Sequence, residues 1–197
     1  MTRGKFIIAA AIIAAIIVGV GVRLFLSSAP ETGSSSTGEA LVGGAFELVD
    51  QDGNPRRDSD FRGDYMLVFF GYTFCPDVCP TSLYNVTLAL DSLDDDVAER
   101  IQPIFITVDP ARDTVATMKA YVENFHPRLV ALTGSDDQIA AVAKAYRVYY
   151  AKAGEDDDYL VDHTAFIYLM DADGRYSRHF SHTTGAEELA EALADLR

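Results

Sequence analysis

Residues 65–80 read YMLVFFGYTFCPDVCP, an apolar run that ends at a glycine and passes directly into a loop with two cysteines. A continuous run of large apolar residues is typical of a central strand that is buried on both faces. Residues 81–93 then place apolar side chains at helical spacing, at Leu83, Val86, Leu90 and Leu93. The stretch therefore predicts a buried strand, a cysteine loop and a helix in direct succession.

The segments on either side predict strands that alternate with helices, which indicates an α/β fold. Ser135 and Gln138 have the spacing of a capping box, which predicts a helix over 136–146. A cysteine loop between a buried strand and a helix, with a late β-hairpin, is the thioredoxin-like arrangement. The other expected elements are strands at 101–108, 129–132, 148–151, 165–170 and 176–180, a helix from Asp113 or Thr114 to about Asn124, and a last helix capped by Thr184 and ending at Leu196.

An N-terminal β-hairpin is expected to extend this fold. Residues 46–49 alternate between apolar and polar and run into Asp50-Gln51-Asp52-Gly53. This tetrapeptide and Asp171-Ala172-Asp173-Gly174 both resemble the start of an EF-hand calcium loop. Neither continues with the further acidic ligands and the closing glutamate of such a loop. Both are therefore predicted to be hairpin turns.

The first 42 residues predict a membrane anchor and a tether. Residues 1–5 carry Arg3 and Lys5, which favour a cytoplasmic N-terminus. Residues 6–26 form an apolar segment, interrupted by Arg23 near its far end, of about the length that spans a bilayer. Residues 27–42 are rich in Ser and Gly and predict a flexible linker. Residues 43–197 are then one thioredoxin-like domain outside the cytoplasm.

A cleaved signal peptide is the alternative interpretation of the N-terminal segment. The best small-residue cleavage site is Ser27-Ser28-Ala29, but Pro30 follows it directly, and the apolar run is longer than a usual signal sequence. Neither cysteine lies near the end of the run, which excludes a lipoprotein anchor. The prediction is an uncleaved single transmembrane helix.

The charge of the chain excludes one class of function. The formal net charge is −14, and the part after residue 26 carries 13 of the 16 basic residues and all 30 acidic ones. Such a domain would not displace the counterions of a nucleic acid, so nucleic-acid binding is not expected. The excess of acidic residues favours binding of cations or of basic patches on a partner protein. Solubility alone is the simpler explanation of this excess.

The two cysteines, Cys75 and Cys79, are the only ones in the chain. Three residues separate them, which matches neither a C-x-x-C redox site nor a four-cysteine zinc site. They offer two soft metal ligands or one reversible disulfide. Because each precedes a proline, neither is expected inside a helix, so the helix should begin at Pro80 with Cys79 as its N-cap. The helix end would then favour the thiolate of Cys79.

A third metal ligand must come from elsewhere in the chain, and His163 is the favoured candidate. It directly precedes the late apolar strand, and in a thioredoxin-like fold the loop before that strand lies against the cysteine loop. The other histidines, His126, His179 and His182, are expected to be surface or capping residues. Two thiolates and one imidazole suit Cu(I), Cu(II) or Zn(II), and the softness of the donors favours copper without excluding zinc.

Three acidic residues are candidates for the surroundings of this site. Asp162 is a candidate acceptor that would orient His163, Asp77 lies between the two cysteines, and Asp109 directly follows the expected strand at 101–108. Asp109 and Asp113 have an alternative role as turn and cap residues, which is the favoured interpretation for both.

Five motifs carry a family resemblance: FGYTFCPDVCP (70–80), ITVDPARDT (106–114), LTG (132–134), AYRVYY (145–150) and YLVDHT (159–164). With them the chain closely resembles the SCO/SenC family of copper chaperones for cytochrome c oxidase assembly. The resemblance implies a thioredoxin-like fold that binds one copper ion through Cys75, Cys79 and His163. It also implies delivery of copper to the dinuclear copper centre of oxidase subunit II.

Three functions remain open after this comparison of motifs. The leading hypothesis is a membrane-anchored metallochaperone, which is not an enzyme, supplied by an upstream copper donor. The second is a thiol–disulfide oxidoreductase that reduces the cysteines of that copper centre, using a Cys75–Cys79 disulfide. The third, a thiol peroxidase, is weakened because no resolving cysteine exists outside the loop. The absence of an Arg-rich transit segment favours a bacterial inner membrane with the domain in the periplasm, with the mitochondrial inner membrane facing the intermembrane space as the alternative.

Overall fold

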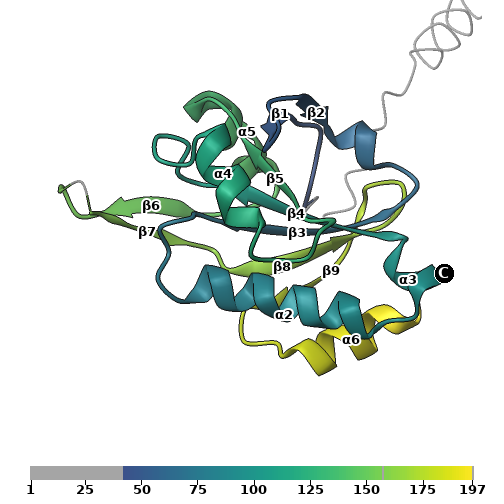
Figure 1. Cartoon of the computed structure of the whole chain (residues 1–197). Helices are drawn as coiled ribbons and strands as arrows, with labels where there is room; N and C mark the ends of the chain where they lie inside the picture. Colours follow the sequence, from purple (N-terminus) through teal and green to yellow (C-terminus); the bar gives the residue numbers. More distant parts are fainter. Residues whose placement is uncertain (1–41, 157, 197) are drawn as a thin grey trace, which may run out of the picture. The chain divides into compact units, whose positions relative to one another are not determined.

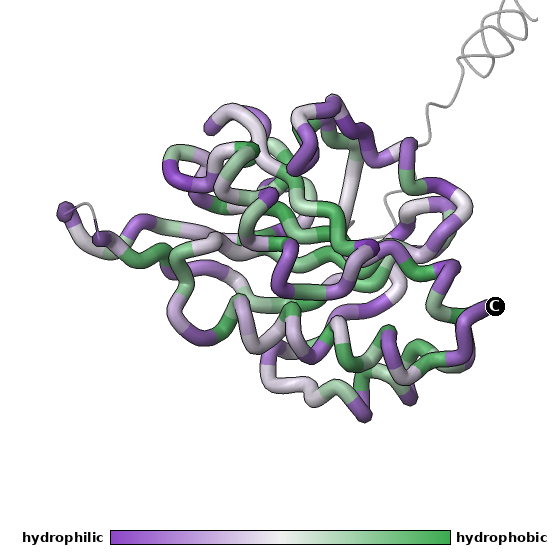
Figure 2. The backbone as a smooth tube through the Cα atoms, viewed as in Figure 1, coloured by the Kyte–Doolittle hydropathy of each residue, from purple (hydrophilic) through white to green (hydrophobic). Residues whose placement is uncertain are grey.

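Strand β3 (Tyr65–Gly71) lies in the centre of the molecule, as its apolar sequence predicts. The structure is a computed structural model that describes residues 42–156 and 158–196. β3 pairs in parallel with β4 (Ile101–Thr107) and antiparallel with β8 (Phe166–Met170). Because both neighbours and both faces are covered, every β3 side chain after Tyr65 is buried. Figure 2 shows these strands as the most hydrophobic part of the backbone.

Seven strands form the main sheet, in the order β2-β1-β5-β4-β3-β8-β9. Helices α2 and α6 cover one face of this sheet, and α4 and α5 lie on the other (Figure 1). This three-layer α/β arrangement agrees with the predicted thioredoxin-like fold. The remaining elements are β1 (Glu47–Asp50), β2 (Pro55–Arg57), η1 (Asp58–Phe61), α2 (Val78–Ser92), α3 (Asp95–Ala98), α4 (Val115–Val122), β5 (Val130–Thr133), α5 (Asp136–Ala145), β6 (Tyr150–Ala153), β7 (Leu160–His163), β9 (Tyr176–Ser181) and α6 (Ala186–Ala194).

The predicted N-terminal hairpin is present as β1 and β2, and β1 joins it to the main sheet by pairing with β5. The Asp50 carboxylate closes the turn, because it accepts hydrogen bonds from the backbone N–H groups of Asp52 at 3.0 Å and Asn54 at 2.8 Å. The predicted capping box of α5 is also present, with Ser135 and Gln138 bonded to each other's backbone.

Helix α2 begins two residues earlier than the sequence predicted. It starts at Val78 with Asp77 as its N-cap, so Cys79 lies inside the first helical turn. The first backbone hydrogen bond of the helix runs from Thr81 N–H to the Asp77 carbonyl at 3.1 Å. Pro80 is tolerated there because a first-turn residue has no intrahelical acceptor for the N–H that proline lacks.

The ends of helices α6 and α4 also differ from the prediction. Helix α6 has Gly185 as its N-cap instead of Thr184, and it ends at Ala194 instead of Leu196. The N–H of Thr184 bonds to the carbonyl of Ser181 at 3.0 Å, so Thr184 belongs to the turn after β9. Helix α4 has Thr114, one of the two predicted residues, as its cap and ends at Val122.

The segment before β8 differs most from its expected structure. The sequence predicted one extended piece at 148–151 and a loop up to His163. Instead, β6 and β7 pair as a separate two-stranded hairpin, and His163 is the last residue of β7. Figure 1 shows this hairpin projecting beyond the main sheet.

The predicted membrane anchor at 6–26 lies outside the described residues, as do the cytoplasmic N-terminus and all of the linker except Val42. Within 42–156 and 158–196, no helix has the length and apolar character needed to cross a membrane.

Candidate metal centre

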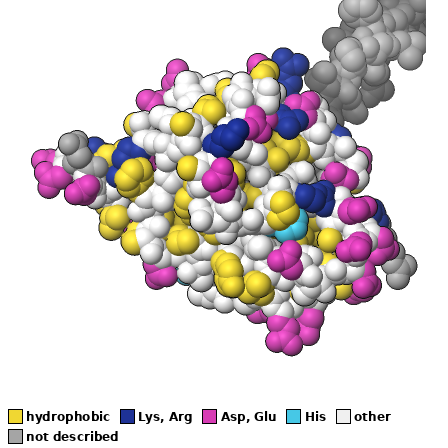
Figure 3. All heavy atoms as spheres, in the orientation of Figure 1, with side chains coloured by type: hydrophobic (Ala, Val, Ile, Leu, Met, Phe, Trp, Pro, Cys, Tyr) yellow, Lys and Arg dark blue, Asp and Glu magenta, His cyan; other side chains and the backbone are white. Residues whose placement is uncertain are grey.

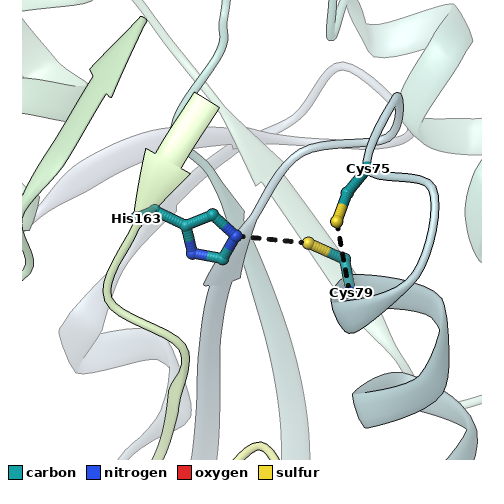
Figure 4. A group of neighbouring side chains, drawn as sticks. All are labelled: Cys75, Cys79 and His163. Atoms are coloured by element: carbon teal, nitrogen blue, oxygen red, sulfur yellow. Dashed lines mark hydrogen bonds between the residues drawn. The ribbon is translucent and has the colours of Figure 1, made fainter. Parts of the chain in front are cut away.

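Three side chains from different elements converge at the end of β3. Cys75 lies in the loop after β3, Cys79 in the first turn of α2, and His163 at the end of β7 (Figure 4). The two sulfur atoms and the imidazole nitrogen lie within 4.8 Å of one another. Cys79 Sγ is 3.5 Å from His163 Nε2, and Cys75 Sγ accepts a hydrogen bond of 3.4 Å from the Cys79 N–H. The structure thus brings together the three residues that the sequence selected as ligands.

Cys79 is fixed by close packing against the end of β3. Its side chain is fully buried, whereas that of Cys75 is half-buried. Gly71 makes this packing possible, because a Cβ atom at Gly71 would lie only 2.7 Å from Cys79 Sγ and 3.0 Å from the Phe105 ring. The glycine that ends the apolar run therefore makes room for a ligand sulfur.

The two thiols have opposite electrostatic environments. A hydrogen bond from the Cys79 thiol, assisted by His163 and by the backbone N–H groups of Asp77 and Cys79, lowers the pKa of Cys75 to about 3 against the effect of its own burial. The same thiol–thiol hydrogen bond, together with burial, raises the pKa of Cys79. The thiolate therefore resides on Cys75, which corrects the prediction that the helix end would favour the thiolate of Cys79. The physical reason is that the Cys79 thiol donates to Cys75 Sγ, which also accepts a hydrogen bond from the Cys79 N–H in the first turn of α2, whereas Cys79 Sγ is buried.

His163 presents Nε2 to the thiols and turns its other nitrogen toward the backbone. Nδ1 lies 3.1 Å from the carbonyl oxygen of Thr164. A proton on Nδ1, donated to this carbonyl, leaves the Nε2 lone pair free to bind a metal. The ring also lies edge-on to those of Phe69, at 6.2 Å, and Tyr72, at 5.9 Å.

The acidic candidates lie around this centre in different ways. Asp162, predicted to orient His163, is exposed on β7, and the Thr164 carbonyl lies against Nδ1 instead. Asp77 caps α2 and is exposed. Asp109 is buried, where it accepts hydrogen bonds from the Arg112 guanidinium at 2.5 Å and from the Tyr159 hydroxyl at 2.7 Å.

Asp113 holds the cysteine loop in place through hydrogen bonds. Its fully buried carboxylate accepts hydrogen bonds from the Thr73 N–H at 3.0 Å, the Thr73 hydroxyl at 2.5 Å and the Thr107 hydroxyl at 2.6 Å. Burial raises its pKa, although these hydrogen bonds oppose the effect. Asp113 thus ties the loop to β4, while Thr114 caps α4.

The other three histidines lie outside the cluster, as the sequence predicted. His126 Nε2 is 3.8 Å from Asp91, and His179 Nδ1 is 2.6 Å from the Tyr176 hydroxyl on β9. His182 follows β9 and is exposed. In the described part of the chain, the cysteine–histidine group is the one set of potential metal ligands of this kind.

Arg112 and Tyr159 lie beside the site but received no role from the sequence. The guanidinium of Arg112 stacks on Tyr159 at 3.6 Å and on Phe74 at 4.7 Å from the ring centroids. The spacing of Asp109 and Arg112, three residues apart, is a signal for an ion pair, but the sequence does not indicate that the pair faces the cysteine loop.

The donor set fits a soft metal ion. Ligand atoms held at about 2.0–2.3 Å from one ion lie at most about 4.6 Å apart, and these three lie within 4.8 Å, so small side-chain adjustments suffice. Structural zinc takes four ligands, whereas this group contains three among the described residues. Two sulfur donors and one imidazole therefore fit copper better than structural zinc.

Comparison with known proteins agrees with this site. A model of the SCO1/SenC family matches residues 34–197. The mitochondrial SCO2 homolog of Bos taurus is 46% identical over 159 residues, which cover 79% of this chain and 60% of that protein. The SCO2-like protein of Rickettsia prowazekii is 40% identical over 190 residues, which cover 91% of this chain and 92% of that protein.

A solved structure extends the similarity to three dimensions. The structure of Bradyrhizobium japonicum ScoI with copper bound is 46% identical, covers 79% of this chain and 99% of that one, and superposes with a TM-score of 0.73. The chain spans only 60% of the length of the bovine relative. The family match nevertheless covers the whole domain that carries the two cysteines and the histidine. The chain belongs to the SCO1/SenC family.

Proposed function

We propose that this protein is a membrane-anchored copper chaperone. It binds one copper ion through Cys75, Cys79 and His163 and delivers it to the dinuclear copper centre of cytochrome c oxidase subunit II during assembly. The observation that carries the proposal is the convergence of two sulfurs and one imidazole nitrogen within 4.8 Å. The copper-bound structure of the similar ScoI supports it. A chaperone hands its cargo on and does not turn over a substrate, so the protein is not proposed to be an enzyme.

The unequal exposure of the ligands suggests an order of release. Cys79 is fully buried, whereas Cys75 and His163 are half-buried. A ligand from an acceptor protein can therefore reach the metal from the side of Cys75 and His163. We infer that exchange begins at Cys75 and that the sulfur of Cys79 is the last to release copper.

The location and partners are part of the same proposal. The apolar segment at 6–26, preceded by Arg3 and Lys5, would hold the domain at the outer face of a bacterial inner membrane, in the periplasm. The relatives include both rickettsial and mitochondrial proteins, which keeps the mitochondrial inner membrane as the alternative. An upstream donor would supply the copper. The face shown in Figure 3 has basic side chains interspersed with acidic ones, which is unlike a nucleic-acid-binding stripe.

Metal analysis of the reduced full-length protein in detergent tests the ligand set. The expected result is one copper per chain, with tight binding lost in Cys75→Ser and in Cys79→Ser, because one thiolate and one imidazole form a much weaker site for a soft metal. His179→Gln, a substitution on β9 outside the cluster, is the matched control and should leave binding unchanged. Stoichiometric, tightly bound copper in either serine variant would contradict the proposal.

A thiol–disulfide reductase is the second candidate function. The low pKa of Cys75 and the 3.4 Å approach of the Cys79 N–H to its sulfur favour it, because a stabilised thiolate next to a second thiol is the arrangement that exchanges disulfides. Such a protein would reduce the cysteines of the copper centre instead of filling it. The two functions use the same thiols and differ in their need for His163.

His163→Ala separates the two candidates. If delivery of copper is the function, oxidase assembly in cells should fail, because Cu(II) binding is lost and Cu(I) is held by two thiolates alone. If thiol exchange is the function, assembly should proceed, because exchange does not need the imidazole. The reduction potential of the variant must be measured alongside, since His163 also contributes to the low pKa of Cys75. Normal assembly together with lost copper binding would favour the reductase.

A further inference from the structure

The β6–β7 hairpin, which carries His163, does not pair with the main sheet. In the described part of the chain, β6 and β7 form a sheet of their own that is not hydrogen-bonded to the seven-stranded sheet. The backbone bonds at its base, such as Thr164 N–H to the Tyr149 carbonyl at 2.9 Å, join the hairpin to itself. Apart from the short link from His163 to β8, the distance between His163 and the cysteines therefore depends on side-chain contacts between this hairpin and the body of the domain.

Arg112 makes contacts with both halves of the metal centre. The centre of its guanidinium lies 3.6 Å from the ring centroid of Tyr159, which directly precedes β7. It lies 4.7 Å from the ring of Phe74 and 5.8 Å from that of Tyr72, both in the cysteine loop. One planar cation is thus stacked between the element that carries the histidine and the loop that carries Cys75.

Arg112 is itself held firmly in this position. Its side chain is only 15% exposed, and its Nε donates to Asp109, whose side chain is 5% exposed, at 2.5 Å. The Tyr159 hydroxyl donates to the other oxygen of the same carboxylate at 2.7 Å. The ammonium group of Lys152, on β6, also lies 3.8 Å from the centroid of the Tyr159 ring. Tyr159, Arg112 and Asp109 therefore attach the hairpin to the body, beside the ring contacts of His163 with Phe69 and Tyr72.

We propose that Arg112 is a positioning residue of the metal centre, which clamps the β6–β7 hairpin onto the cysteine loop and so sets the separation between His163 Nε2 and the two sulfurs. The inference rests on the proposed copper-binding function. Arginine suits this role because its planar guanidinium stacks on aromatic rings while it binds a carboxylate, whereas the compact ammonium of lysine does not stack in this way. Arg112 acts through His163 and does not bind the metal.

Arg112→Lys in the full-length protein tests the clamp, because it keeps the charge and removes the stacking. Positioning residues behind metal ligands change metal affinity by about 10- to 100-fold, so Cu(II) affinity should fall by this factor and the imidazole-nitrogen coupling in the Cu(II) EPR spectrum should weaken. Cu(I) affinity, which rests on two thiolates, should stay within about two-fold of wild type. Adding Arg112→Lys to His163→Ala should produce no further loss of Cu(II) affinity.

A second readout needs no metal. In the copper-free protein, Arg112→Lys should accelerate amide hydrogen exchange in β6 and β7 by about ten-fold, because local opening of the hairpin becomes easier. Arg100→Lys is the matched control: Arg100 lies 5.7 Å from the Tyr65 ring, at the opposite end of β3 from the cysteines. This control should change neither copper binding nor hairpin exchange.

Tyr159 gives an independent pair of variants if Arg112→Lys fails to fold. Tyr159→Leu removes the stacked ring and should reproduce the loss of Cu(II) affinity, while Tyr159→Phe keeps the ring and should largely preserve binding.

Several results would overturn the clamp. The first is a Cu(II) affinity and a rate of amide hydrogen exchange in the hairpin that are both unchanged in Arg112→Lys. The second is that Arg112→Lys lowers Cu(II) affinity by the same factor in the presence and in the absence of His163. The third is normal Cu(II) binding in Tyr159→Leu. If the wild-type protein binds no copper, the proposed function fails, and hairpin exchange alone then decides whether the clamp exists.

Discussion

Single residues at the end of β3 decide how the two thiols differ. Gly71 lets Cys79 Sγ pack against the strand, so this sulfur is buried and its pKa is raised, first by the hydrogen bond to Cys75 and then by burial. Cys75, four residues earlier, stays half-buried and receives the hydrogen bonds that stabilise a thiolate. A small set of contacts thus makes two chemically identical side chains different, one a buried thiol and the other an accessible one.

We predict that Gly71→Ala displaces Cys79 and weakens the metal centre. The new methyl group would lie 2.7 Å from Cys79 Sγ and 3.0 Å from the Phe105 ring, so atoms of the core must move. Overpacking of this kind costs about 1–3 kcal/mol of stability. Thermal unfolding and copper titration of the full-length protein check both effects.

Gly185→Ala is the control for Gly71→Ala, because a Cβ atom at Gly185 meets nothing within 4 Å. Gly185 caps α6, so its replacement by alanine should cost no more than about 1 kcal/mol and leave copper binding intact. Unchanged copper affinity in Gly71→Ala would show that the cysteine tolerates displacement.

At the scale of elements, two short hairpins complete the main sheet and place His163 beside the cysteines. The β1–β2 hairpin extends the main sheet next to β5, and the β6–β7 hairpin carries His163 to the cysteine loop. The turn of the first hairpin depends on Asp50, which is 2% exposed and accepts hydrogen bonds from Asn54 and from Arg56 at 2.9 Å. Burial raises its pKa, but these hydrogen bonds outweigh it and hold the pKa of Asp50 below its ordinary value.

This lowered pKa predicts how the contribution of Asp50 varies with pH. An acid whose pKa is lower in the folded than in the unfolded protein stabilises the fold above its unfolded pKa of about 3.9, and the contribution disappears as the pH falls through the folded pKa. Asp50→Asn should therefore destabilise the protein by about 1–3 kcal/mol at pH 7. The difference from wild type should shrink below about pH 4. Thermal unfolding of both proteins at pH 7 and pH 3 measures it.

Asp171→Asn, in the turn between β8 and β9, is the comparison for Asp50→Asn. Asp171 also accepts hydrogen bonds from two backbone N–H groups, those of Asp173 and Arg175, but it is only partly buried. Its replacement should have a smaller effect at pH 7. A destabilisation of Asp50→Asn that stays constant down to pH 3 would contradict the proposed role of the charge.

At the scale of the whole molecule, the metal centre lies where the main sheet, helix α2 and the separate hairpin meet (Figure 1). The sheet supplies a rigid base, because β3 and β4 are buried almost throughout. The hairpin is hydrogen-bonded to no strand of the main sheet among the described residues and contacts the body through side chains.

We predict that the protein keeps its N-terminal segment as an anchor. The proline directly after the best cleavage site and the length of the apolar run oppose removal of residues 1–29, while Arg3 and Lys5 favour a cytoplasmic N-terminus. Mass spectrometry of the protein extracted from membranes should find the segment present, and an alkaline carbonate wash should leave the protein in the membrane fraction. A mature chain that begins near Pro30 would refute the anchor.

The sequence by itself determined the order of the central elements and selected Cys75, Cys79 and His163 as candidate ligands. The run at 65–80 predicted a buried strand followed by a cysteine loop, because apolar periodicity and proline act locally. His163 was selected by its place before the late strand and by the family motif.

Only the tertiary structure decided how these parts work together. Cys79 and His163 are 84 positions apart, and their 3.5 Å approach depends on the β6–β7 hairpin, which the sequence did not predict. The location of the thiolate on Cys75 and the stacking of Arg112 between two elements are likewise results of long-range packing. Local patterns specify strands, helices and turns, but the burial of a thiol and the contacts of a guanidinium arise only when distant segments come together.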